Sequence, residues 1–227
     1  RAFPRHPAAM QVFKAPLEEP GLMGQEAFWS SVYEAAGAPR EWHPGYAELR
    51  PVLDDWLSAH PREELRVLHV GCGTSLVTEG LWNDGFRSIC NVDFSEPAIR
   101  FMARHWETLA AEADAKEQVS GASMRQGVEW LCMDAADLRE LGSGSFDVVL
   151  EKNTLDVILS GSGAAASEAR QRGRAAVNEF HRVLAVGGLF LSIAYVDRGR
   201  AAFLRAGGLF HLEECRRLPS GPVGEPF

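Results

Sequence analysis

An α/β fold, with a mostly parallel sheet and helices on both of its faces, is what the sequence predicts. Short apolar runs alternate with stretches of helical periodicity from about residue 65 onward. A tight glycine turn directly follows the first apolar run, as it does where a strand leads into a helix. Such alternation builds right-handed βαβ units, and the 227 residues are enough for one domain of this kind with a full core.

Five strands and three long helices are expected in this part of the chain. The apolar runs predict strands at residues 66–70, 88–93, 128–133, 146–151 and 188–196. The helical periodicity predicts helices at residues 76–84, 97–113 and 165–183. Residues 112–127 are polar, and we expect them to extend the second helix and then form a loop. Residues 160–166 are rich in Gly, Ser and Ala, which favours a flexible connection.

The chain before the first strand differs from the rest. Residues 1–24 hold four of the twelve prolines and show no periodicity, so we expect an N-terminal arm or the remnant of a leader. Residues 25–227 are expected to form a single domain. Within it, apolar positions at helical spacing predict two helices, at residues 25–36 and 47–60, ahead of an α/β core at residues 65–227.

Composition argues against several classes of protein. The net charge of −8 argues against a general nucleic-acid binder, which usually carries a basic face. No apolar run approaches the roughly 20 residues needed to cross a bilayer, so no membrane segment is expected. Cys72, Cys90, Cys132 and Cys215 form no CxxC pair, so we expect no metal site.

The most informative motif is the run VLHVGCGTS at residues 67–75, which joins an apolar strand to a turn that contains Gly71 and Gly73. Glycines at these places allow backbone N–H groups to approach a ligand closely. Asp93 ends the second predicted strand, and its carboxylate can accept hydrogen bonds from both hydroxyls of a ribose. Strand, glycine turn and acid together predict a nucleotide-type pocket.

The position of this pocket follows from the strand order. Gly71, Asp93, Asp134 and Glu151 all lie at the carboxyl ends of predicted strands. Ligands of parallel α/β sheets bind at that edge, close to the point where the strand order reverses. A dinucleotide fingerprint would place a third glycine at Leu76, so its absence argues against NAD or FAD as the ligand.

Several segments resemble the motifs of the Rossmann-like methyltransferases that use S-adenosylmethionine. These segments are residues 67–75, Val92-Asp93-Phe94, Met133-Asp134-Ala135, residues 146–152 and the turn RVLAVGG at residues 182–188. The resemblance implies a seven-strand-type sheet and S-adenosylmethionine as the cofactor, with S-adenosylhomocysteine as the product. It also implies that Phe94 packs on the adenine and that Asp134 and Ala135 contact the adenine amino edge. The plainer alternative is that Asp93 and Asp134 only cap helices.

Two departures from the motif matter. His69 stands where the first motif usually has an acid, and Ser75 stands where it has its last glycine. In many relatives the acid helps to hold the amino end of the cofactor, so another residue must do that work here. After residue 196 only residues 209–218 have the pattern of a strand, so the last strand of the sheet is expected to be short or absent.

A narrower resemblance is to the methyltransferase-like protein-lysine methyltransferases. The segments that carry it are FWSSVY at residues 28–33, EWHPGY at residues 41–46 and LEKNTLD at residues 150–156. The resemblance implies that Trp29, Tyr33 and Trp42 fold over the cofactor as a lid and that Lys152 touches the cofactor. On composition alone, the three aromatic residues would be ordinary core residues. A π face near a sulfonium also has a physical use, because it attracts cations.

Two carboxylates beside Lys152 are candidates for the chemistry. A lysine substrate must lose its proton before it attacks, because the unperturbed pKa of lysine is about 10.4. We expect Glu151 and Asp156 to hold the incoming ammonium and to orient its lone pair, and the alternative is that either residue is structural. Asn153 replaces the glycine that the family has between them.

The substrate is expected from the branches of that family, which act on translation elongation factor 1-alpha or, in a mitochondrial branch, on citrate synthase. The forms GCGTS and VDFS and the long segment before the third strand are closer to the citrate synthase branch, whereas DGFRSICNVD is closer to the other. We therefore expect citrate synthase, with elongation factor 1-alpha as the alternative. A small-molecule methyltransferase and a non-catalytic cofactor-binding partner are further alternatives. The basic start of the chain, residues 1–10, favours the mitochondrial matrix over the cytoplasm.

Overall fold

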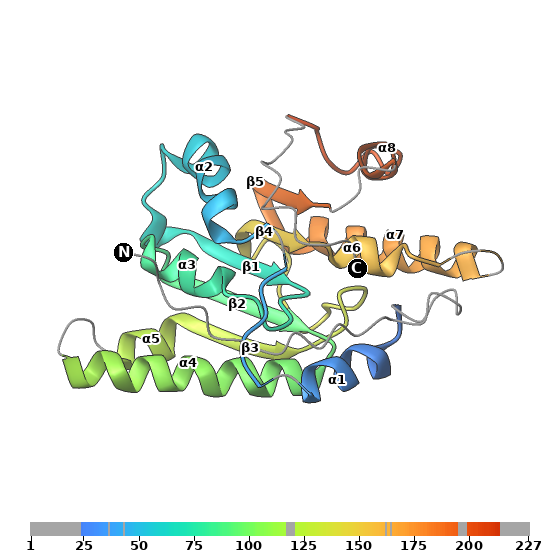
Figure 1. Cartoon of the computed structure of the whole chain (residues 1–227). Helices are drawn as coiled ribbons and strands as arrows, with labels where there is room; N and C mark the ends of the chain where they lie inside the picture. Colours follow the sequence, from blue (N-terminus) through green and yellow to red (C-terminus); the bar gives the residue numbers. More distant parts are fainter. Residues whose placement is uncertain are drawn as a thin grey trace, which may run out of the picture.

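The computed structural model describes residues 24–35, 37–42, 44–116, 121–161, 163, 165–194 and 199–213. Five strands form one sheet in the order β3-β2-β1-β4-β5, and every neighbouring pair is parallel (Figure 1). Their bounds are Arg66–Val70 (β1), Ser88–Asp93 (β2), Val128–Cys132 (β3), Phe146–Lys152 (β4) and Leu184–Ile193 (β5). The predicted parallel α/β sheet is therefore confirmed.

Seven strands are not found in the part of the chain that the structure describes. Residues 209–213, the first half of the run predicted as a last strand, form no strand, and the rest of that run lies outside the described residues. The strand β5 begins earlier than expected, at Leu184. Its pairing with β4 is irregular, because Phe146 pairs with Leu184 and Val148 with Leu189. The two glycines of the turn lie inside this bulge instead of ahead of the strand.

Eight α-helices accompany the sheet among the described residues. They are Glu26–Glu34 (α1), Tyr46–Leu57 (α2), Val77–Asn83 (α3), Glu96–Lys116 (α4), Gly121–Gly127 (α5), Thr154–Ile158 (α6), Ala165–Val183 (α7) and Arg200–Arg205 (α8). The expected helices correspond to α1 to α4 and α7, whereas α5, α6 and α8 were not expected. None of the described helices is long and apolar enough to cross a membrane.

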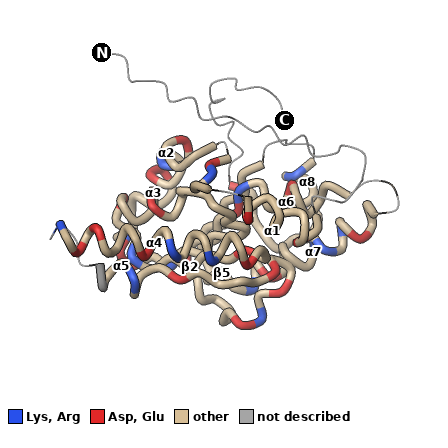
Figure 2. The backbone as a smooth tube through the Cα atoms, turned by 60° about the horizontal axis from the view of Figure 1, so that its bottom comes forward, with Lys and Arg blue, Asp and Glu red and all other residues tan. Residues whose placement is uncertain are grey.

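The helix α5 replaces most of the loop expected at residues 112–127. Tertiary contacts explain it: Met124 is buried, and its backbone carbonyl accepts a hydrogen bond of 3.0 Å from the indole of Trp106 on α4. Arg125 pairs with Glu107 and Asp114 of α4 at 2.7 and 2.9 Å. Figure 2 shows acidic and basic positions along α4, beside which α5 lies. Packing and paired charges thus hold a segment whose polarity alone predicts a loop.

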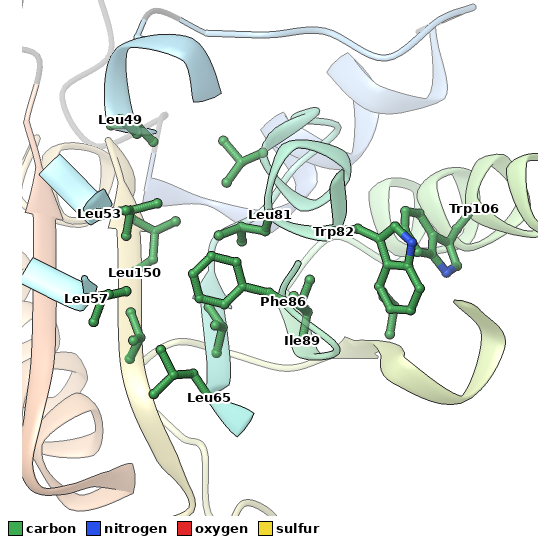
Figure 3. Packing of buried hydrophobic residues seen from close by; sticks show 14 of the residues in the cluster. Leu49, Leu53, Leu57, Leu65, Leu81, Trp82, Phe86, Ile89, Trp106 and Leu150 are labelled. Atoms are coloured by element: carbon green, nitrogen blue, oxygen red, sulfur yellow. The ribbon is translucent and has the colours of Figure 1, made fainter. Parts of the chain in front are cut away.

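The two faces of the sheet carry separate cores. On one face, α2, α3 and α4 cover residues of β1, β2 and β4, and Figure 3 shows Leu53 and Leu57 pointing toward Leu150. On the other face, Phe180 and Val177 of α7 pack on the sheet. Because the helices that follow β1 and β4 cover opposite faces, the strand order reverses between these two strands. A ligand-binding crevice is expected at the carboxyl ends of β1 and β4, where such a reversal occurs.

Candidate active site

The glycine turn after β1 has the backbone conformation that its sequence predicts. Gly71 and Gly73 have φ angles of 63° and 49°, in the left-handed region that favours glycine. A Cβ atom at Gly71 would overlap the side chain of Thr154, and one at Gly73 would lie 2.5 Å from the hydroxyl of Tyr33. The turn is therefore a cradle that only glycine permits, with Tyr33 directly above it.

Asp93 is fixed at the end of β2 by this turn. Its side chain accepts a hydrogen bond of 2.8 Å from the backbone N–H of Gly73 and one of 2.9 Å from that of Ser95. Asp93 is only 6% exposed. Burial raises its pKa to about 6, although the two N–H donors act in the opposite direction. Each carboxylate oxygen keeps a further lone pair, so the geometry suits two hydroxyl donors.

The predicted lid aromatics lie together over the crevice. Trp29 stacks on Tyr33 with ring centroids 5.8 Å apart, and it meets Trp42 edge-on at 6.0 Å. All three belong to one cluster with Phe94, the residue predicted to pack on the adenine. Burial raises the pKa of Tyr33 above its usual range, so its hydroxyl stays protonated. The structure thus brings together four residues from two distant segments.

Asp134 and Ala135 follow β3 at the far side of Phe94. One oxygen of Asp134 accepts the N–H of Ala136 at 3.0 Å, and the other pairs with Arg172 of α7 at 2.7 Å. An open cavity of about 680 Å³ lies here, and Phe94, Asp134 and Arg172 are among its lining residues. This volume is in the range of small-molecule sites, which supports placing the adenine end of a nucleoside there.

Lys152 ends β4 with its side chain only 3% exposed. Its ammonium donates hydrogen bonds of 2.8 Å to a carboxylate oxygen of Glu41 and to the backbone carbonyl of Trp42. Glu41 is not one of the predicted site residues, although it belongs to the segment EWHPGY, which carries part of the family resemblance. The structure therefore joins the N-terminal segment to the end of β4 through a charged pair.

The two candidate catalytic carboxylates share one partner. Arg200 of α8 donates to Glu151 at 2.7 Å and to Asp156 at 2.6 Å. Glu151 also accepts hydrogen bonds from the Ser192 hydroxyl and from the N–H of Leu155. Its side chain is 0% exposed, whereas that of Asp156 is 27% exposed. An incoming ammonium could not reach Glu151 in this arrangement, so the structural alternative fits Glu151 better.

The pKa of Asp93 leads to a prediction about pH. The charged carboxylate accepts hydrogen bonds from two hydroxyls, whereas the protonated form has lost an acceptor site. The affinity for the ligand is therefore present above the pKa of Asp93 and is lost as pH falls through about 6. We expect the dissociation constant of S-adenosylhomocysteine to rise about tenfold between pH 8 and pH 5. Calorimetry at both pH values measures this. In Asp93→Asn the ratio between the two pH values should be near one, and the same ratio in both proteins would contradict the prediction.

The glycine turn, the buried Asp93 and the cavity beside Phe94 are the features of a Rossmann-like enzyme that binds a nucleoside cofactor. They define the class of this protein. The family model for the Methyltransferase domain matches residues 68–192, more than half of the chain, so the chain belongs to this family. Membership implies S-adenosylmethionine as the cofactor, and the residues of the crevice fit it. The described residues contain no group of three or more His, Cys, Asp or Glu side chains that could hold a metal ion.

Two relatives within this family have names that give a more specific activity. The chain is 35% identical over 172 residues to the eEF1A lysine and N-terminal methyltransferase of Bos taurus. The aligned residues are 75% of this chain and 21% of that protein. It is 32% identical over 174 residues to EEF1A lysine methyltransferase 4 of Mus musculus, covering 74% and 60% of the two chains. The chain thus spans only part of each relative. The solved structure of PH0226 from Pyrococcus horikoshii OT3 is 21% identical, with a TM-score of 0.48, over 70% of this chain and 63% of that one.

Proposed function

We propose that this chain transfers a methyl group from S-adenosylmethionine to a lysine side chain of the elongation factor eEF1A. The observation that supports this best is the identity of about a third, over three quarters of the chain, to proteins named as eEF1A lysine methyltransferases. The expected preference for citrate synthase gains no support, and the alternative takes its place. The mitochondrial location stays a prediction, because residues 1–10 lie outside the described residues.

The residues that would hold the cofactor surround the crevice. Gly71 and Gly73 would let the backbone of the turn approach the cofactor closely, and Asp93 would accept hydrogen bonds from its ribose hydroxyls. Phe94, Asp134 and Ala135 would surround the adenine, and Lys152 would lie near the other end. When bound, the cofactor supplies a methyl group activated by a positively charged sulfur. Trp29, Tyr33 and Trp42 would exclude water from that group and present π faces to its charge.

The substrate lysine enters as an ammonium, loses one proton to solvent, and is then held as a neutral amine in line with the activated methyl group. Its nitrogen lone pair forms the new N–C bond while the S–C bond breaks, which leaves a methylated ammonium and S-adenosylhomocysteine. Asp156 is the candidate carboxylate that reaches the solvent side, and it would hold the incoming ammonium before that proton leaves. Glu151, which lies behind it, would position Asp156 through Arg200.

The proposal predicts which protein is labelled. Purified chain is mixed with S-adenosylmethionine that carries a radioactive methyl group and with either eEF1A or citrate synthase. We expect label in eEF1A, on a lysine identified by mass spectrometry, and none in citrate synthase. A chain with Asp93→Ala is the control and should label neither protein. Label in citrate synthase alone would overturn the choice of substrate, and cofactor binding without any labelling would favour a non-catalytic partner.

A further inference from the structure

The first position of the glycine motif cannot supply a negative charge to the pocket. His69 lies on β1, fully buried, where methyltransferases with this motif often carry an acid. Burial and the positive charge of Lys152 lower its pKa to about 3, so the imidazole is neutral. Its paired residue on β2, Asn91, carries no charge either. Lys152 therefore needs a counter-charge from another element.

Glu41 provides that counter-charge from outside the core. It is the carboxylate that forms an ion pair with Lys152 among the described residues, with nitrogen and oxygen 2.8 Å apart. The same carboxylate accepts hydrogen bonds of 2.9 Å from the Ser75 hydroxyl and from the N–H of Leu76. One side chain thus joins the end of β4 to the end of the glycine turn, which are distant in sequence.

The neighbours of Glu41 make the same connection. The backbone N–H of Arg40 donates to the carbonyl of Thr74 at 3.0 Å, and the carbonyl of Trp42 accepts from Lys152. Trp42 also packs against Trp29 of α1. Residues 40–42 therefore attach the aromatic lid to the glycine turn and to Lys152 at once, so the placement of the lid and the positioning of Lys152 depend on the same contacts.

We propose that Glu41 is a positioning residue that holds Lys152 and the glycine turn in their cofactor-binding arrangement and so replaces the acid missing at position 69. The proposal rests on the assignment of this crevice to the cofactor. A lysine that is almost fully buried is costly without an opposite charge, so loss of Glu41 leaves Lys152 without its ion-pair partner. The lid then loses the contacts that the Glu41 carboxylate makes with Lys152 and with the end of the glycine turn.

The first test is the rate at which S-adenosylhomocysteine leaves the protein. Hydrogen bonds to charged groups are strong enough that Glu41→Gln should raise this rate about tenfold or more. Stopped-flow measurement of tryptophan fluorescence follows it, because Trp29 and Trp42 line the lid. Glu34→Gln is the matched control, since Glu34 is an exposed residue at the end of α1, seven positions before Glu41. It should keep the parent rate.

The second test needs no cofactor. Trypsin should cut after Arg40 faster once the backbone of Arg40 detaches from Thr74, so Glu41→Gln should be cut there several times faster than the parent and the Glu34→Gln control, after each rate is divided by the rate at which the same unfolded protein is cut at that bond. Mass spectrometry of the new N-terminus identifies the site. Should Glu41→Gln fail to fold, Glu41→Asp, which keeps the charge with a shorter reach, should show both effects at a smaller size.

A double-mutant cycle separates positioning from general stabilisation. If Glu41 acts through Lys152, then Glu41→Gln should add little to the faster dissociation already caused by Lys152→Met. Parent rates of dissociation and cleavage in Glu41→Gln, or fully additive effects in the cycle, would overturn the proposal. None of these measurements involves methyl transfer, so a failure to label eEF1A would leave their outcome unaffected.

Discussion

Asp93→Ala should weaken the binding of S-adenosylmethionine by about 30- to 150-fold, which corresponds to roughly 2–3 kcal/mol for two charge-assisted hydrogen bonds. The residue lies at the end of β2 with both carboxylate oxygens already directed by backbone N–H groups. It therefore needs no reorganisation to receive a ribose. Calorimetry with the parent and variant proteins measures the difference.

The control for this prediction is an acid outside the crevice. Asp137→Ala removes a carboxylate that pairs with exposed Arg139, and it should leave the cofactor affinity unchanged. Unchanged affinity in Asp93→Ala would remove Asp93 from the pocket. Binding of NAD by the parent protein with an affinity similar to that for S-adenosylmethionine would overturn the cofactor assignment as a whole.

The strands of the core were predictable because their burial leaves a continuous signal in the sequence. β1 and β2 have the predicted bounds, and in each strand every residue after the first is buried. A strand buried on both faces appears as a mostly apolar run, which only His69 interrupts in β1 and Asn91 in β2 before its last residue Asp93. α7 was predictable from its period, because its buried residues recur at helical spacing from Gly173 to Val183.

Short helices and irregular pairing were less predictable. α6 has only five residues, too few for periodicity to show, and it begins after Asn153 in the left-handed conformation with a φ of 62°. Asn tolerates this conformation better than most residues that have a side chain, which fits its standing where the family has glycine. A tertiary contact sets the position of α6, because the hydroxyl of Thr154, its first residue, donates a hydrogen bond of 3.0 Å to the carbonyl of Val70.

The residues of the candidate site likewise fall into a predictable group and an unpredictable one. Gly71 and Gly73 lie in the turn after β1, and Asp93 ends β2, so the positions of all three were predictable from the strands. Glu41 and Arg200 were missed because their partners are far away in sequence: Lys152 is 111 residues from Glu41, and Glu151 is 49 residues from Arg200. No local pattern marks such a pair, and only the folded chain brings its members together.

Arg200→Met should lower the free energy of unfolding by about 3–5 kcal/mol, the usual cost of removing one partner from a buried ion pair. Glu151 is fully buried, and without Arg200 its charge would keep only the hydrogen bonds from Ser192 and Leu155. Burial already raises the pKa of Glu151, while the charge of Arg200 acts to lower it. Chemical denaturation of the parent and the variant at pH 7 measures the loss.

A double variant shows whether the loss comes from the unpaired charge. Glu151→Gln combined with Arg200→Met should recover much of the stability, because no buried charge then lacks its partner. Arg139→Met, which removes an exposed ion pair, should leave the free energy of unfolding nearly unchanged. If Arg200→Met were as stable as the parent, Arg200 would not hold Glu151 in solution. Glu151 could then be free to meet a substrate ammonium, as the sequence first suggested.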